Sequence, residues 1–198
     1  MKPCLAPATL LLMALAATLA GCTSTPPTHF HSLMPVPSAS PSNTALVPIA
    51  RWELLPVTVP VQVDQAPWVV RLPDGSLAVL EFERWAAPVG DEIRAALAER
   101  LREVVPAIRA PQGFRIAVDI QRLEAMPGRY ARLEAEWTLR AGDSGAVQLR
   151  CRSVIEQAPA GASYPALAAA HRAAVARLAD LVAAALQALD KDVKPACG

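Results

Sequence analysis

Few residues in this chain have the types and spacing that catalysis requires. The segment Gly142-Asp143-Ser144-Gly145 resembles the nucleophile segment of trypsin-like proteases. Those proteases take their general base from a histidine that lies upstream, within a barrel of many strands. The only upstream histidines here are His29 and His31, in a stretch rich in Pro and Ser. Because Gly, Asp and Ser are also typical of hairpin turns, we expect a turn at this point and not a nucleophile.

The other candidates for chemistry carry less information. His29 and His31 have the spacing of two metal ligands, but a protein zinc site needs three or four. His171 lies beside the apolar stripe of an expected C-terminal helix, where a structural role is favoured over a catalytic one. The sequence contains no Gly-x-Ser-x-Gly elbow, Walker loop or Cys-x-x-Cys pair. We therefore predict a protein that is not an enzyme, with no catalytic residue, metal site or cofactor.

The most specific chemical signal is Cys22, at the end of Leu19-Ala20-Gly21-Cys22. Lys2 and an uncharged, mostly apolar run from Ala8 to Ala20 precede it, as in a secretory signal peptide. That run is shorter than the ~20 residues of a membrane-spanning helix. Leu-Ala-Gly-Cys resembles the bacterial lipobox, in which the cysteine is acylated and becomes the first mature residue. The alternative is ordinary secretion with Cys22 as a plain thiol. We favour lipidation because four positions match.

Lipidation of Cys22 implies a chain that lies on a bilayer and does not span it. One acyl chain gives only marginal, reversible binding, but three chains, palmitate among them, would hold the protein on the membrane permanently. By resemblance to bacterial lipoproteins, a residue other than Asp after the cysteine favours the outer membrane, and here it is Thr23. We therefore expect an outer-membrane, lipid-anchored protein on the periplasmic face.

The remaining cysteines and the charge limit the partners. Cys4 leaves with the signal peptide, while Cys151 and Cys197 remain in the mature chain. The periplasm permits disulfides, so these two cysteines can pair; alternatively, Cys151 is buried and Cys197 is free. The formal net charge of +1 argues against nucleic acid as a partner, because nucleic-acid binding normally needs a basic patch.

The composition divides the chain into four parts. We expect a signal peptide over residues 1–21, the lipidated cysteine and a Pro/Ser/Thr-rich tether over 22–50, one globular domain over 51–190, and a tail over 191–198. A flexible tether of ~23 residues spans about 25–30 Å, which would hold the domain clear of the lipid headgroups. Within the tether, the segment from His29 to Leu33 is a candidate for a short ordered piece that docks on the domain.

Periodicity within the globular part predicts strands and two main helices. Alternation indicates an edge strand from Trp52 to Val63, because Pro56 and Pro60 within it cannot donate ladder hydrogen bonds. Two further strands, Trp68–Leu72 and Leu77–Arg84, are joined by a turn with Asp-Gly. Helices are expected from Pro88 to Pro106 and after Ser163.

Residues 114–157 predict three consecutive antiparallel strands with one buried and one polar face. Each strand carries apolar side chains at alternate positions and charged side chains between them. The charged face is either a solvated surface with weak cross-strand ion pairs or a contact surface for a partner. The expected fold class is α/β, a single domain with a mixed, largely antiparallel sheet of about six strands packed with two main helices. Whether the helices cover one sheet face or both stays open.

Several segments together resemble one family. They are Pro56-Val57-Thr58-Val59-Pro60, then Val63-Asp64 and Val69-Val70-Arg71, then Glu83-Arg84-Trp85-Ala86-Ala87-Pro88-Val89, with Phe30 and Leu33 upstream and Leu133-x-x-x-Trp137 downstream. With the lipobox, this arrangement resembles the PqiC family of ABC-type transport auxiliary lipoproteins. The chain departs from the pattern at His31, where the family tends to have tyrosine.

The resemblance implies a non-catalytic envelope component. Relatives are outer-membrane lipoproteins that assemble as rings, as homo-oligomers. They cooperate with MCE-type periplasmic proteins and ABC or inner-membrane transporter components in lipid transport. Arg84 and Trp85, within the matching segment, are the candidate partner contacts. The alternative is a structural or efflux-accessory envelope lipoprotein without a lipid transport role.

Overall fold

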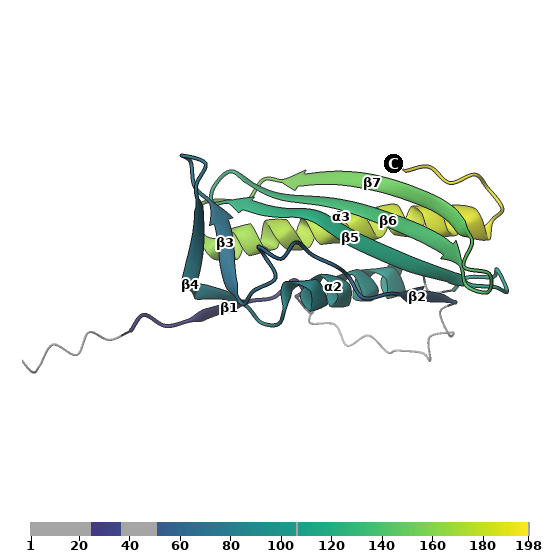
Figure 1. Cartoon of the computed structure of the whole chain (residues 1–198), viewed down its shortest axis with the longest axis horizontal. Coiled ribbons are helices and arrows are strands. Elements are labelled where there is room, and N and C mark those ends of the chain that lie inside the picture. Colours follow the sequence, from purple (N-terminus) through teal and green to yellow (C-terminus); the bar gives the residue numbers. More distant parts are fainter. Residues whose placement is uncertain (1–24, 37–50, 106, 198) are drawn as a thin grey trace, which may run out of the picture.

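The computed structural model describes residues 25–36, 51–105 and 107–197, which fold into two sheets and two helices (Figure 1). Cys22 lies outside the described residues. The elements in chain order are β1 (His29–His31), β2 (Trp52–Leu54), β3 (Pro67–Arg71), β4 (Leu77–Trp85), α2 (Val89–Val104), β5 (Phe114–Met126), β6 (Tyr130–Ala141), β7 (Val147–Gln157) and α3 (Tyr164–Asp190).

The larger sheet has four strands in the order β2-β5-β6-β7, and its strands run along the long axis of the domain (Figure 1). β5, β6 and β7 are antiparallel, with Val118 opposite Trp137 and Trp137 opposite Cys151. This confirms the three antiparallel strands predicted over 114–157. Their alternate apolar side chains fill the core, and Trp137 is 1% exposed. The register shifts once in β5, between Ile120 and Arg122, and Leu123 is buried beyond that shift.

The edge strand predicted from Trp52 to Val63 is much shorter than expected. Only Trp52–Leu54 pairs as a strand, parallel to β5. Beyond it, Thr58 forms an isolated bridge with Asp119. Pro56 and Pro60 interrupt the ladder because they have no N–H to donate. The expected edge position is confirmed, since β2 pairs with one neighbour in the order given above.

A second, three-stranded sheet has the order β1-β4-β3. β3 and β4 form the predicted hairpin, in which the Ser76 N–H donates to Asp74 at 2.9 Å. Gly75 adopts a φ of 88°, which only glycine reaches without strain. β1 pairs in parallel with the last residues of β4. The described residues thus hold seven strands in two sheets, compared with the expected single sheet of about six.

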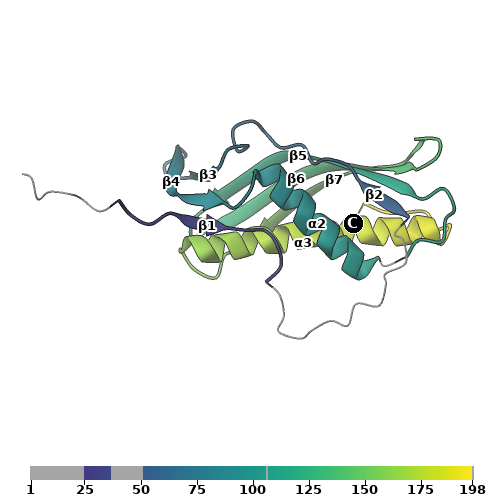
Figure 2. The same ribbon diagram turned by 90° about the horizontal axis from the view of Figure 1, so that it is seen from below.

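Both helices lie on the same face of the four-stranded sheet (Figure 2). α2 begins after Pro88 and ends at Val104, ahead of Pro106, as predicted. α3 begins after Ser163, whose Oγ accepts a hydrogen bond from the Ala166 N–H at 3.3 Å. The helices therefore cover one face of the four-stranded sheet, which the sequence analysis had left open. No helix among the described residues has the length and apolar character of a membrane span.

The segment around β1 is part of the folded unit. The carboxylate of Glu92 in α2 accepts hydrogen bonds from Ser32 Oγ at 2.7 Å and from the Leu33 N–H at 2.8 Å. From α3, Arg172 donates to the Ser32 carbonyl at 3.0 Å. The Leu33 side chain is 2% exposed. Residues 29–33, which their composition places in the tether, therefore dock on the domain, as the sequence analysis allowed.

We predict that Glu92→Ala releases this segment and lowers the free energy of unfolding by about 1–3 kcal/mol, because the buried Leu33 N–H would lose its acceptor. Glu103→Ala on the same helix is the matched control. The side chain of Glu103 is 69% exposed, so its removal should change stability by less than about 0.5 kcal/mol. Urea unfolding gives both values, and hydrogen exchange at the Leu33 amide reports the release. Equal effects of the two variants would contradict the prediction.

Candidate functional site

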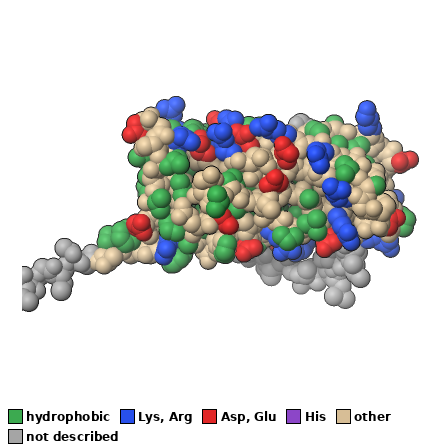
Figure 3. All heavy atoms as spheres, in the orientation of Figure 1, with side chains coloured by type: hydrophobic (Ala, Val, Ile, Leu, Met, Phe, Trp, Pro, Cys, Tyr) green, Lys and Arg blue, Asp and Glu red, His purple; other side chains and the backbone are tan. Residues whose placement is uncertain are grey.

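The solvent face of the four-stranded sheet carries a dense mixture of positive and negative side chains (Figure 3). Glu134 on β6 lies at its centre. Its carboxylate accepts from Arg132 Nε at 3.0 Å and Arg152 Nη2 at 3.0 Å, and Arg122 Nε lies 3.2 Å away. The side chain of Glu134 is only 8% exposed, while those of Arg122 and Arg152 are more than half exposed. Three guanidinium groups thus surround one shielded carboxylate.

A second carboxylate, Glu124 on β5, joins the two sheets. Arg71 of β3 donates to it at 2.6 Å, and the Tyr130 hydroxyl donates to its other oxygen at 2.6 Å. Arg122 lies between the two carboxylates, 3.7 Å from Glu124. The ion pairs therefore form one continuous network over β3, β5, β6 and β7.

This network fixes the ionisation of its members. The hydrogen bond from Arg152 lowers the pKa of Glu134, and the hydrogen bond from Arg71 lowers the pKa of Glu124. Accepting from Tyr130, Glu124 in turn raises the pKa of that phenol. Both carboxylates are thus anionic at neutral pH and held by arginine. A carboxylate in this state is poorly suited to general acid–base work, which needs a pKa near the working pH.

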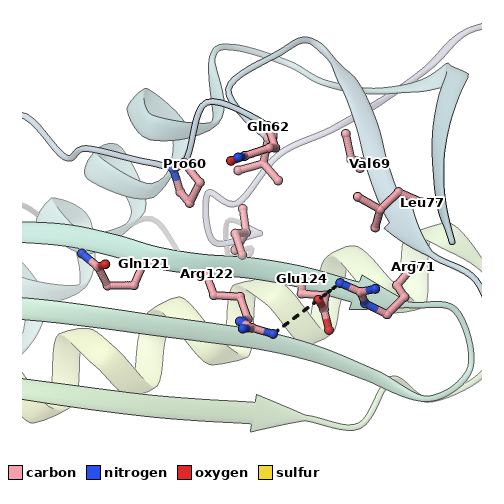
Figure 4. Close-up of a pocket in the computed structure, with 10 residues that line it drawn as sticks. Pro60, Gln62, Val69, Arg71, Leu77, Gln121, Arg122 and Glu124 are labelled. Carbon is pink, nitrogen blue, oxygen red and sulfur yellow. Dashed lines mark hydrogen bonds and ion pairs between the residues drawn. The ribbon is translucent and has the colours of Figure 1, made fainter. Parts of the chain in front are cut away.

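A groove of about 340 Å³ borders this network, between the β3–β4 hairpin and β5 (Figure 4). Its walls are largely apolar, and Arg71, Arg122 and Glu124 lie at one side of it. The groove thus presents apolar side chains beside charged groups of both signs. The residues that line it are Pro60, Gln62, Val63, Val69, Arg71, Leu77, Gln121, Arg122, Leu123 and Glu124.

His171 is buried in an aromatic cluster on the helix side. Its side chain packs 5.8 Å from Trp68 and 6.0 Å from Trp85, measured between ring centroids. The residue is 1% exposed, and neither ring nitrogen has a hydrogen-bond partner. Burial lowers its pKa to about 4, so the ring is neutral at physiological pH. This environment agrees with the structural role expected for His171.

His29 and His31 of β1 both contact Glu83 of β4, at 2.9 Å and 2.5 Å. Burial raises the pKa of Glu83, but the hydrogen bonds from the two histidines outweigh burial and leave the pKa lowered. Within the described residues, no group of three or more His, Cys, Asp or Glu side chains has the arrangement of a metal site. The contacts of the two histidines with Glu83 join β1 to β4.

Ser144 lies in a turn, as predicted. It connects β6 with β7, and the Ser144 N–H donates to the Asp143 carboxylate. This turn is at the end of the sheet where Ala141 pairs with Phe114, whereas His171 packs against the three-stranded sheet at the opposite end (Figure 1). The structure does not bring the serine and the histidine together.

Of the two residues proposed as partner contacts, Trp85 belongs to the core. Its indole is 3% exposed and packs 4.6 Å from Trp68, between ring centroids. The indole is thus not available to a partner on the surface. Arg84 is half-buried and lines a hollow of about 340 Å³ with Phe30 and Asp64. Of the two candidates, Arg84 is the one with part of its side chain at the surface.

Cys151 and Cys197, which the sequence analysis left as either paired or separate, meet in the structure. A disulfide joins Cys151 on β7 to Cys197 in the tail, with 5.4 Å between the Cα atoms. The Cys151 side chain faces the core, so the bond ties the segment after α3 back to the edge of the sheet.

We predict that Glu134→Gln lowers stability at neutral pH by roughly 1–2 kcal/mol, because Arg152 loses its anionic partner and Arg122 and Arg132 each lose one of two. The pKa of Glu134 lies below its ordinary value of 4.5 in the folded state. Its stabilisation is therefore complete above that pH and is lost as the pH falls through the folded-state pKa. The difference from wild type should shrink on acidification. Glu136→Gln, an exposed carboxylate on the same strand, is the control. A difference that is constant with pH would contradict this.

Removing the cross-link should also cost stability. A disulfide that closes a loop of 46 residues stabilises a protein by roughly 2–4 kcal/mol. Cys197→Ser is therefore predicted to lose about this amount in urea unfolding of the oxidised protein. Wild type under reducing conditions should match the variant. If a thiol reagent modifies Cys151 and Cys197 of the denatured, oxidised wild type, as located by peptide mass spectrometry, the bond does not form.

A comparison with solved structures finds proteins that share the fold of this chain. Protein XCC0632 from Xanthomonas campestris shares the fold, with a TM-score of 0.65 and 17% identity over 83% of this chain and 98% of that one. A crystal structure of an uncharacterized protein gives a TM-score of 0.60 and 15% identity over 80% and 97% of the two chains. A search of curated protein sequences gives no match.

The family model described as ABC-type transport auxiliary lipoprotein component matches residues 31–183. The match begins within β1 and ends within α3, so it includes both sheets, both helices and the charged sheet face. This chain is a member of the ABC-type transport auxiliary lipoprotein family.

Proposed function

We propose that this protein is a non-catalytic auxiliary component of an MCE/ABC-type lipid transport system, anchored in the outer membrane through acylated Cys22 and facing the periplasm. The observation that carries the proposal is the family match over residues 31–183. The lipobox ahead of the domain and Thr23 after its cysteine support the anchor and its destination.

The chemistry of the described residues supports a role without catalysis. The two shielded carboxylates of the sheet face, Glu124 and Glu134, form ion pairs with arginines. The ring of His171 is enclosed by aromatic side chains. Ser144 lies in a turn without a neighbouring base among its hydrogen-bond partners in the described structure. What the domain offers at its surface is contact area with both signs of charge.

The sheet face and the groove beside it are the surfaces best suited to partners. Exposed Arg122 and Arg152 alternate with carboxylates, a pattern that favours one orientation of a partner by charge complementarity. The partners we propose are an MCE-type periplasmic protein and further copies of this chain in a ring. The competing function, a structural or efflux-accessory lipoprotein, predicts neither the MCE-type partner nor a lipid-related defect.

The proposal predicts that the tagged lipoprotein co-purifies with an MCE-type protein and that its deletion sensitises cells to detergents. Wild type should restore resistance, and Cys22→Ser should not, because the domain would leave the membrane. Ser144→Ala is the control and should restore resistance fully. Mass spectrometry of the mature amino terminus measures the acylation directly. A deletion strain with normal barrier function and no MCE-type partner would contradict the transport role.

A further inference from the structure

The chain leaves the domain at one end of its long axis. Residues 25–28 extend away from β1 beside the three-stranded sheet, opposite the turn that joins β6 to β7 (Figures 1 and 2). β1 is fixed there by its pairing with β4, by Glu83 and by the bonds of Ser32 and Leu33 to Glu92. The position of an anchor at Cys22 is therefore limited by the few residues ahead of β1.

Covalent geometry makes this connection short. Six residues lie between Cys22 and His29, so the two Cα atoms are seven steps apart. An extended chain spans at most about 3.5 Å per step, or roughly 24 Å in all. A flexible chain of this length has a typical end-to-end distance of about 15 Å. This is shorter than the separation expected from a tether that runs to residue 45. An anchored domain must remain close to the headgroups.

The surface at this end is suited to a bilayer. Phe30 is 65% exposed although it lies in a strand. It lines two hollows, one of about 340 Å³ with Ala86 and Pro88, and one of about 760 Å³ with Ala162 and Pro165. All four of these neighbours are exposed. We call Phe30 with these four residues the β1 rim.

The carboxylates of the β1 rim hollows have cationic or protonatable neighbours. Glu83 contacts both His29 and His31, and Asp64 lines the same hollow as Arg84. The rim thus combines exposed apolar side chains with a few charged groups of both signs.

We propose that the β1 rim rests on the outer membrane and that Phe30 inserts into the lipid interface. The inference rests on the proposed lipidation of Cys22. Once the acyl chains are inserted, the anchor holds the rim near the lipid at a high effective concentration. A weak apolar contact of the rim with lipid then suffices. The domain then stands with its long axis away from the bilayer. The 13-residue strand β5 alone spans about 40 Å, so the β6–β7 turn projects toward the periplasm.

The test uses the full lipidated chain in vesicles of phosphatidylethanolamine and phosphatidylglycerol, with or without brominated acyl chains. Phe30→Trp carries the probe. Val147→Trp is the control, because Val147 is 48% exposed and lies at the opposite end of the sheet. The emission of the native tryptophans, measured on wild type, is subtracted. We expect brominated lipid to quench the added emission of Phe30→Trp and to leave that of Val147→Trp nearly unchanged.

Flotation of the vesicles separates the two hypotheses. If the protein floats and the two probes are quenched equally, or neither is quenched, the β1 rim does not contact lipid although the anchor is correct. If a second copy covers Phe30, brominated lipid leaves the probe unquenched while Phe30→Asp weakens self-association, which also overturns the inference. If the protein does not float, the anchor itself is wrong and this inference falls with it. Circular dichroism checks that both variants keep the fold.

Discussion

One-sided burial of the four-stranded sheet is the constraint on which the rest of the structure depends. Alternation along β5, β6 and β7 sends apolar side chains such as Trp137 to one face, and both helices must cover that face. The other face is left to Arg122, Arg132, Arg152 and the carboxylates that they hold. The charged surface and the compact core thus have the same cause. A single slip of register would exchange the two faces.

Local pattern predicted most of the fold. The three antiparallel strands, the β3–β4 hairpin and both helices follow from periodicity, turn residues and prolines within the segments themselves. The pattern was less informative where pairing depends on distant residues. Alternation continued from Trp52 to Val63, but only three residues pair with β5. The second sheet consists of the β3–β4 hairpin with β1 added to it. β1 and β4 are more than 40 residues apart in the chain, so no local signal predicts their pairing.

The site was harder to predict than the fold. Alternation placed Glu134, Arg132 and Arg152 on one face, but Arg122 joins them through a register shift in β5 that the sequence does not announce. Glu92 lies in the first turn of α2, where a carboxylate suits the helix dipole. That local fit gives no sign that Glu92 also binds the distant Ser32–Leu33 segment. Trp85 was chosen as a partner contact because it lies in a segment that resembles the family, yet it is buried. Similarity to a family marks positions needed for packing as readily as those needed for contact.

The bond between Cys151 and Cys197 has a consequence for biogenesis. The cytoplasm keeps thiols reduced, while the periplasm oxidises them. Under the proposed export, a precursor in the cytoplasm would therefore lack the cross-link and its share of stability, and would be easier to keep unfolded for translocation. The disulfide would then form only after the chain has crossed the inner membrane. The redox state of the compartment would thus determine where the disulfide stabilises the chain, and under the proposed localisation that is the periplasm.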